Sequence, residues 1–96
     1  METIRELSAI RADIDKIDDQ IVQLFVQRMQ LAQEVARTKK TTGNAVSHPG
    51  REQEILQRVG GAAGALAPYT ERLFQTIFTL SKAYQTQLMT ESGESK

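Results

Sequence analysis

The sequence predicts an all-α fold with three helices per chain, at about residues 4–42, 49–60 and 67–90. In the N-terminal half, apolar residues recur every three or four positions, which is typical of a helix with one buried stripe. The only two prolines, Pro49 and Pro68, each suit the first turn of a further helix. No segment shows the two-residue alternation of a half-buried strand.

The first segment is predicted to be one long helix. It contains no proline, and Gly43 at its far end is its only glycine. A helix of roughly 36–39 residues would be about 55 Å long. The apolar series runs through Leu7, Ile10, Ile14, Ile17, Ile21, Leu24, Leu31 and Val35.

This length predicts a homodimer. A compact domain of this size has a radius of gyration of about 12–13 Å, so its own chain cannot cover a helix of ~55 Å. Another molecule must cover part of the stripe, and a symmetric pair is the commonest arrangement.

The remaining chain completes one domain, residues 1–90. Ser47 is the expected N-cap of the second helix. The Gly/Ala-rich run at 60–65 is expected to be a loose connection. The third helix should bury Phe74, Ile77 and Phe78, and residues 91–96 are expected to form a disordered polar tail.

Composition excludes several functional classes. Twelve basic and twelve acidic residues give no net charge, so no overall field favours nucleic acid or an anionic membrane. The chain has no cysteine and one histidine, which makes a zinc site unfavourable. Neither a signal pattern nor an apolar run of about 20 residues occurs, which predicts a cytoplasmic protein.

Two cations interrupt the apolar pattern of the long helix. Arg28 occupies the next stripe position after Leu24, and burying a guanidinium costs several kcal/mol unless an anion meets it. That anion can be a carboxylate of the partner helix or a bound ligand. Lys39 lies on the same face, about 16 Å further along, although a lysine there can also extend to solvent.

The later helices carry similar breaks. Ser81 and Gln85 continue the stripe of Phe74 and Phe78, where leucine would be expected. Glu52 shares a face with Ile55, but a carboxylate in the first helical turn also complements the helix dipole. Polar breaks of this kind mark either the polar end of an amphipathic helix or a functional site.

The arginines favour an anionic ligand. Arg11 lies about 25 Å from Arg28 along the helix and is rotated by ~100°, so one chain cannot bring both to one small molecule. In an antiparallel dimer of long helices, Arg11 of one chain can approach Arg28 of the other. Guanidinium groups are the preferred bidentate partners of carboxylates, so a small dicarboxylate with a further polar group is the predicted ligand.

Three stretches carry a family resemblance: residues 10–21 (IRADIDKIDDQI) followed by Arg28, Val35 and Lys39; residues 46–56 (VSHPGREQEIL); and residues 72–85. Together they resemble the all-helical chorismate mutases over about residues 5–88. The resemblance implies three helices per chain in an intertwined homodimer of the chorismate mutase II type, whose two active sites each use both chains.

The implied reaction converts chorismate to prephenate by an intramolecular [3,3] rearrangement in phenylalanine and tyrosine biosynthesis, without metal or cofactor. Holding the substrate in its folded conformer and stabilising charge on the ether oxygen would supply the catalysis. By resemblance, Arg28 and the partner's Arg11 bind the carboxylates. Lys39 and Gln85 hydrogen-bond to the ether oxygen, and Glu52 holds the ring hydroxyl. The remaining implied substrate-binding residues are His48, Arg51, Ser81, Val35, Ile55 and Ile77.

One departure and several alternatives remain. His48 stands where the family commonly has an acid, which affects how the hydroxyl end of the substrate and Arg51 are held. An isochorismate pyruvate lyase could use a similar pocket, and a non-catalytic dimeric helical module could bind a ligand there. The sequence is compatible with a free-standing enzyme and with the mutase portion of a bifunctional protein.

Overall fold

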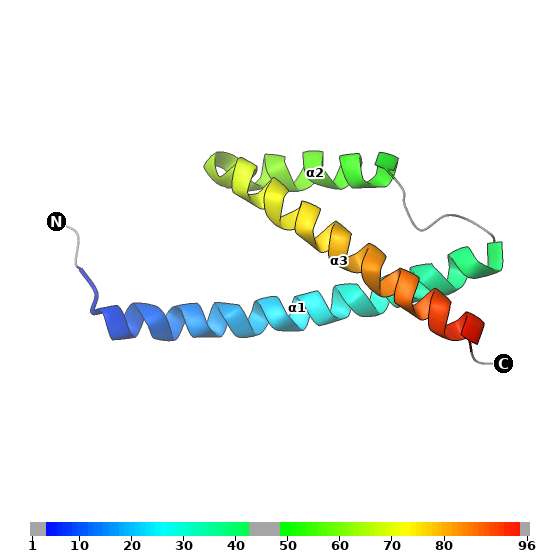
Figure 1. The fold of residues 1–96 in the computed structure, drawn as a ribbon. Helices are drawn as coiled ribbons and strands as arrows, with labels where there is room; N and C mark the ends of the chain where they lie inside the picture. The colour runs from blue at the N-terminus through cyan, green and yellow to red at the C-terminus, as the bar shows by residue number, and fades with distance from the viewer. Residues whose placement is uncertain (1–3, 43–48, 95–96) are drawn as a thin grey trace. The chain divides into compact units, whose positions relative to one another are not determined.

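A computed structural model describes residues 4–42 and 49–94 of the chain (Figure 1). In chain order the elements are α1 (Leu7–Thr42), α2 (Pro49–Ala63), the short 3-10 helix η1 (Gly64–Leu66) and α3 (Ala67–Glu94). Every regular element in these two ranges is helical, which confirms the all-α class. The chain divides into two compact units, Met1–Gln30 and Leu31–Lys96, and each is described by itself.

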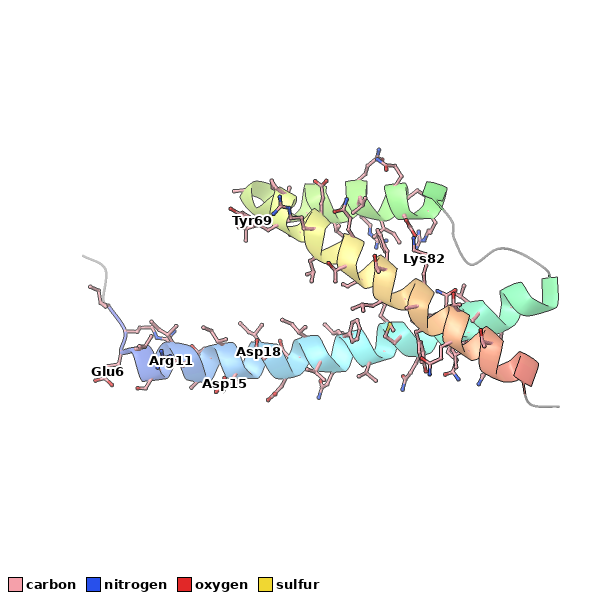
Figure 2. All side chains as sticks on the ribbon, in the orientation of Figure 1. Glu6, Arg11, Asp15, Asp18, Tyr69 and Lys82 are labelled. Carbon is pink, nitrogen blue, oxygen red and sulfur yellow. The ribbon has the colours of Figure 1, made fainter. Side chains whose placement is uncertain are left out.

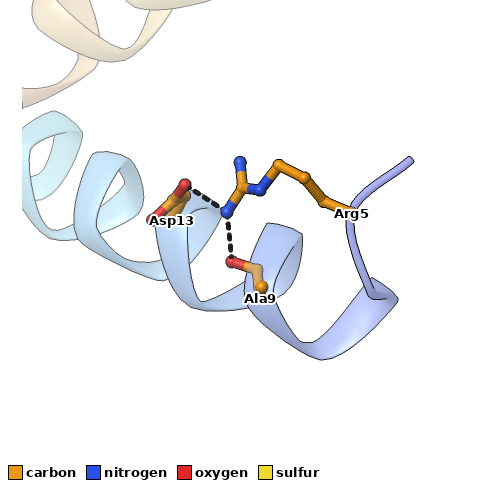
Figure 3. Close-up of polar contacts among 3 residues, drawn as sticks. All are labelled: Arg5, Ala9 and Asp13. Atoms are coloured by element: carbon orange, nitrogen blue, oxygen red, sulfur yellow. Dashed lines mark hydrogen bonds and ion pairs between the residues drawn. The ribbon is translucent and has the colours of Figure 1, made fainter. Parts of the chain in front are cut away.

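Helix α1 begins three residues after its expected start at residue 4. The carbonyl of Glu6 accepts hydrogen bonds from the backbone N–H groups of Ala9 at 3.0 Å and Ile10 at 3.1 Å. Arg5 folds over this first turn: its Nη2 donates to the Ala9 carbonyl at 3.1 Å and pairs with Asp13 Oδ2 at 2.7 Å (Figure 3). Both partners of this ion pair are half exposed, so it fixes the local geometry more than it stabilises the fold.

The apolar stripe in the N-terminal part of α1 is exposed. Ile10 is 37% exposed, Ile17 is 54% exposed and Leu24 is 63% exposed. A single chain therefore leaves this stripe largely open to water, at a free-energy cost that grows with the apolar area exposed.

The buried positions in the last part of α1 are not those with the largest apolar side chains. Ala32 and Ala36 are buried, whereas Leu31 is 60% exposed and Val35 is 42% exposed. Both alanines lie about 100° around the helix from the leucine and valine that precede them. Sequence analysis did not single them out, because an alanine fits a buried face and an exposed face equally well.

Helix α2 is longer than predicted, because Gly60 and Gly61 do not end it. Gly60 is buried, and a Cβ added there would lie 2.9 Å from Glu71 Oε2 of α3. This glycine lies within α2 and faces the flexible end of the Glu71 side chain. The predicted loose connection at 60–65 is wrong, because α2 continues through Gly60 and Gly61 to Ala63.

Gly64 ends α2. Its φ angle is +58°, in the left-handed region that favours glycine, and it is the only residue with positive φ in the described part of the chain. A left-handed glycine directly after the last helical residue is a common helix stop. The chain then forms η1 and, after it, α3; α2 and α3 pack against each other as a helical hairpin (Figure 1).

The core of this hairpin contains Ile55 of α2 and Phe78 of α3, both 6% exposed. Phe74 meets Phe78 edge to face, with ring centroids 6.3 Å apart. Helix α3 continues to Glu94, four residues past its expected end and into the segment predicted to be a disordered tail. Within the described ranges, no helix combines the length and the apolarity that a membrane crossing would need.

Candidate functional site

Two polar side chains of α3 are buried where the sequence predicted a break in the apolar stripe. Ser81 is 6% exposed and Gln85 is 7% exposed. They follow Phe78 and lie one helical turn apart, so α3 presents a buried face that changes from aromatic to polar toward its C-terminus.

The amide of Gln85 is incompletely satisfied. Its Oε1 is buried and has no hydrogen-bond partner among the described residues. Leaving a buried acceptor unpaired costs about 1–3 kcal/mol, so native proteins rarely retain one without a reason. A donor from a ligand would remove this cost.

Glu52 projects from the first turn of α2 and meets α3. Its Oε2 lies 3.1 Å from Nζ of Lys82, and the two side chains are 27% and 37% exposed. Figure 2 labels Lys82 on α3. Lys82 directly follows Ser81, so this ion pair lies beside the buried polar face of α3. From the sequence, Glu52 could simply complement the dipole of its own helix. The structure shows in addition that it pairs with a cation of another helix.

Arg51 has a different environment from its neighbour Glu52. Its Nη1 lies 3.4 Å from Glu54 Oε1, and both side chains are more than half exposed. This is an i, i+3 pair on the surface of α2, a kind that contributes little to stability. The guanidinium is therefore accessible to a ligand at the start of α2.

The predicted apolar walls differ in burial. Ile55 is buried and Ile77 is half-buried, both in the hairpin of α2 and α3. Val35, in α1, is 42% exposed. Glu52, Ile55, Ile77, Ser81 and Gln85 thus all belong to α2 and α3, the two helices that pack against each other.

The predicted carboxylate-binding arginines belong to the other unit, Met1–Gln30. Arg28 is half-buried, as expected of a cation on an apolar stripe, and Arg11 is exposed. Lys39 lies within α1, but its side chain is outside the described part of the structure, and so is all of His48.

Lys82 was not among the site residues predicted from the sequence. A lysine next to a buried stripe resembles an ordinary solvent-facing residue, and its carboxylate partner lies on another helix. The one available signal was indirect: Glu52 was an acid on an apolar face with no cation on its own helix to meet it.

The site offers hydrogen-bond donors and acceptors, and the described residues include no group of three or more side chains that could hold a metal ion. A hydroxyl, an amide and a carboxylate, next to apolar walls, suit the orientation of a polar ligand. The family model for chorismate mutase type II matches residues 10–86, which include all of α2 and most of α1 and α3.

The chain belongs to the chorismate mutase type II family.

Relatives agree with this assignment. Over 92 residues the chain is 32% identical to a chorismate mutase of Methanocaldococcus jannaschii, covering 93% of each protein. It is 33% identical over 92 residues to the bifunctional chorismate mutase/prephenate dehydratase of Escherichia coli K12. That match covers 93% of this chain but 24% of the bifunctional protein. A bifunctional protein of the same name from Aquifex aeolicus is 32% identical over 56 residues, 58% of this chain.

Proposed function

We propose that this chain catalyses the rearrangement of chorismate to prephenate, in the biosynthesis of phenylalanine and tyrosine. The observation that best supports the proposal is the buried pair Ser81 and Gln85, with the amide oxygen of Gln85 unpartnered among the described residues. A helix that serves only as a scaffold would gain stability from leucine at these positions. Membership in the chorismate mutase type II family supports the same function. The proposal includes a cytoplasmic location.

The reaction needs positioning and charge stabilisation rather than a nucleophile. The substrate must fold so that the two ends of its [3,3] array meet, and fixing that conformer removes an entropic barrier. In the proposed site, Arg28 and Arg11 of the partner subunit bind the two carboxylates. Bidentate guanidinium contacts suit this task because they fix both the position and the orientation of a carboxylate.

Negative charge develops on the ether oxygen as its bond to carbon breaks. Lys39 and Gln85 are proposed to donate hydrogen bonds to that oxygen, which strengthens these contacts most in the transition state. The amide of Gln85 suits a second role at the same time. While its nitrogen donates to the ether oxygen, its buried Oε1 remains available to accept a hydrogen bond.

The hydroxyl end of the substrate is proposed to bind at the start of α2. Glu52 accepts a hydrogen bond from the ring hydroxyl, while the accessible Arg51 and the buried Ser81 support the carboxylate end. Val35, Ile55 and Ile77 are the proposed apolar walls. His48 replaces an acid that is common at this place in the family, so we propose that it contributes to substrate binding rather than to the central chemistry.

The proposed active unit is an intertwined homodimer with two shared sites. The exposed apolar stripe of α1 supports this, because Ile17 at 54% exposure and Leu24 at 63% exposure are uncovered in one chain. A symmetric partner would bury that stripe and deliver its own Arg11.

Product analysis by NMR tests the function directly. We expect the purified chain to convert chorismate to prephenate, and Gln85→Leu, which keeps the size of the side chain but removes the amide, to lose most of this turnover. Pyruvate and salicylate formed from isochorismate, with chorismate unchanged, would instead assign an isochorismate pyruvate lyase. A folded chain that turns over neither compound would contradict an enzymatic role.

A further inference from the structure

Lys82 links the two helices of the hairpin at the place where the substrate hydroxyl is proposed to bind. Its Nζ lies 3.1 Å from Glu52 Oε2, so a cation of α3 meets a carboxylate in the first turn of α2. Both side chains are less exposed than those of the neighbouring surface pair Arg51 and Glu54, which are 57% and 70% exposed. That surface pair joins two residues of the same helix, whereas the Lys82 contact spans two helices.

The ion pair with Lys82 involves only one of the two carboxylate oxygens of Glu52. Lys82 holds Oε2 of Glu52, and a carboxylate has about four acceptor positions distributed over its two oxygens. Oε1 therefore retains its capacity to accept a hydrogen bond from a hydroxyl group. The ammonium need not be displaced for a ligand to bind.

Without a partner, Glu52 would be a mobile side chain. Glutamate is among the residues that lose most rotamer freedom when they are held in one geometry. An ammonium fixed on a neighbouring helix removes part of that freedom before the ligand arrives. Lys82 is itself well placed for this, since it follows the buried Ser81 on a helix that packs against α2.

We infer that Lys82 is a positioning residue that holds the Glu52 carboxylate in the orientation that receives the ring hydroxyl of the substrate. This inference rests on the proposed function of the chain. Lys82 acts through Glu52 and does not contact the reacting atoms.

Removing Lys82 should change KM and kcat to different extents. The ring hydroxyl is not one of the atoms whose bonds form or break, so its contact with Glu52 is about equally strong in the ground state and in the transition state. Losing such uniform binding raises KM and leaves kcat nearly unchanged. Loss of a group that acts on the ether oxygen would instead lower kcat.

The experiment compares steady-state kinetics of three variants of the full chain with chorismate. We expect Lys82→Met to raise KM about five- to tenfold, less than the loss of a whole hydrogen bond to a charged group because the Glu52 carboxylate remains, with kcat within about threefold of the wild type. Lys82→Arg, which keeps the charge, should recover most of the loss. Arg58→Met removes an exposed cation from α2 and is the matched control, with both constants unchanged.

A double-mutant cycle then shows whether Lys82 acts through Glu52. In a Glu52→Gln background, we expect Lys82→Met to have no further effect on KM, because the carboxylate it positions is gone. An unchanged KM for Lys82→Met, or an equal rise of KM in both backgrounds, would overturn the inference. If the wild-type chain turns over no chorismate, the proposed function fails before Lys82 is tested, so the two failures are distinguishable.

Discussion

At the scale of single residues, the polar positions on apolar faces carry the most information. Ser81 and Gln85 were recognisable from sequence because each occupies a stripe position that leucine would normally fill, and both are buried. Arg28 was singled out in the same way, and it is half-buried. Lys82 was not recognisable, because its importance depends on a partner on another helix.

Removing the Arg28 side chain is predicted to cause a large loss of catalytic efficiency. Arg28→Ala should lower kcat/KM for chorismate by at least about 10³-fold, because it deletes a clamp on one substrate carboxylate and a charge that cannot be replaced by water. Steady-state rates measured beside Arg58→Ala, an exposed arginine of α2, provide the check. A loss smaller than tenfold would remove Arg28 from the site.

Replacing Gln85 with glutamate is predicted to make the reaction acid-dependent. A carboxyl group can donate a hydrogen bond to the ether oxygen only when it is protonated, and burial raises the pKa of a carboxyl group. Gln85→Glu should therefore be nearly inactive above neutral pH and gain activity as the pH falls toward about 5. Rates of the wild type and the variant over the same pH range test this, and a variant whose rate does not rise in acid would contradict the donor role of Gln85.

At the scale of helices, the sequence predicts where segments are helical better than where they end. Gly60, Gly61 and Gly64 are equivalent as sequence signals for a helix end. Of the three, only Gly64 has a positive φ angle and ends α2. Gly60 instead lies against Glu71 of α3, a contact that no local pattern reveals. The buried Ala32 and Ala36 were missed for a related reason, because the burial of a small residue depends on which face of α1 is covered.

Two glycine-to-alanine substitutions should therefore have opposite effects on stability. Gly64 has a φ of +58°, so Gly64→Ala should lower the free energy of unfolding by about 1 kcal/mol. Gly61 lies within α2 with open space at its Cβ position, so Gly61→Ala should raise that free energy by roughly 0.5–1 kcal/mol. Urea denaturation followed by circular dichroism measures both. Equal effects of the two variants would mean that the chain reversal does not depend on Gly64.

At the scale of the whole molecule, one chain leaves an apolar stripe uncovered. The sequence predicted this from length alone, since a helix of 36 residues is too long for so short a chain to cover. What sequence could not supply is the identity of the covering surface, because apolar side chains attract any apolar surface of suitable shape. In the proposed homodimer, a second copy of the chain supplies that surface.

Sedimentation tests the homodimer. The wild-type chain should sediment as a dimer at micromolar concentration, and Ile17→Glu should shift the equilibrium toward monomer, because a charge on the stripe cannot be buried without a partner. Gln23→Glu adds the same charge about 120° around the helix from Ile17 and should stay dimeric. A wild-type chain that is a compact monomer at this concentration would contradict both the homodimer and the shared sites.

The buried amide of Gln85 has a consequence for any attempt to make this protein resist heat. Its oxygen has no hydrogen-bond partner among the described residues, so Gln85→Leu should melt at a higher temperature than the wild type while losing its turnover. A laboratory selection that rewards heat resistance, without requiring the reaction product, would favour this change. The positions at which such a population first replaces its polar residues would then identify the catalytic surface, without an activity assay.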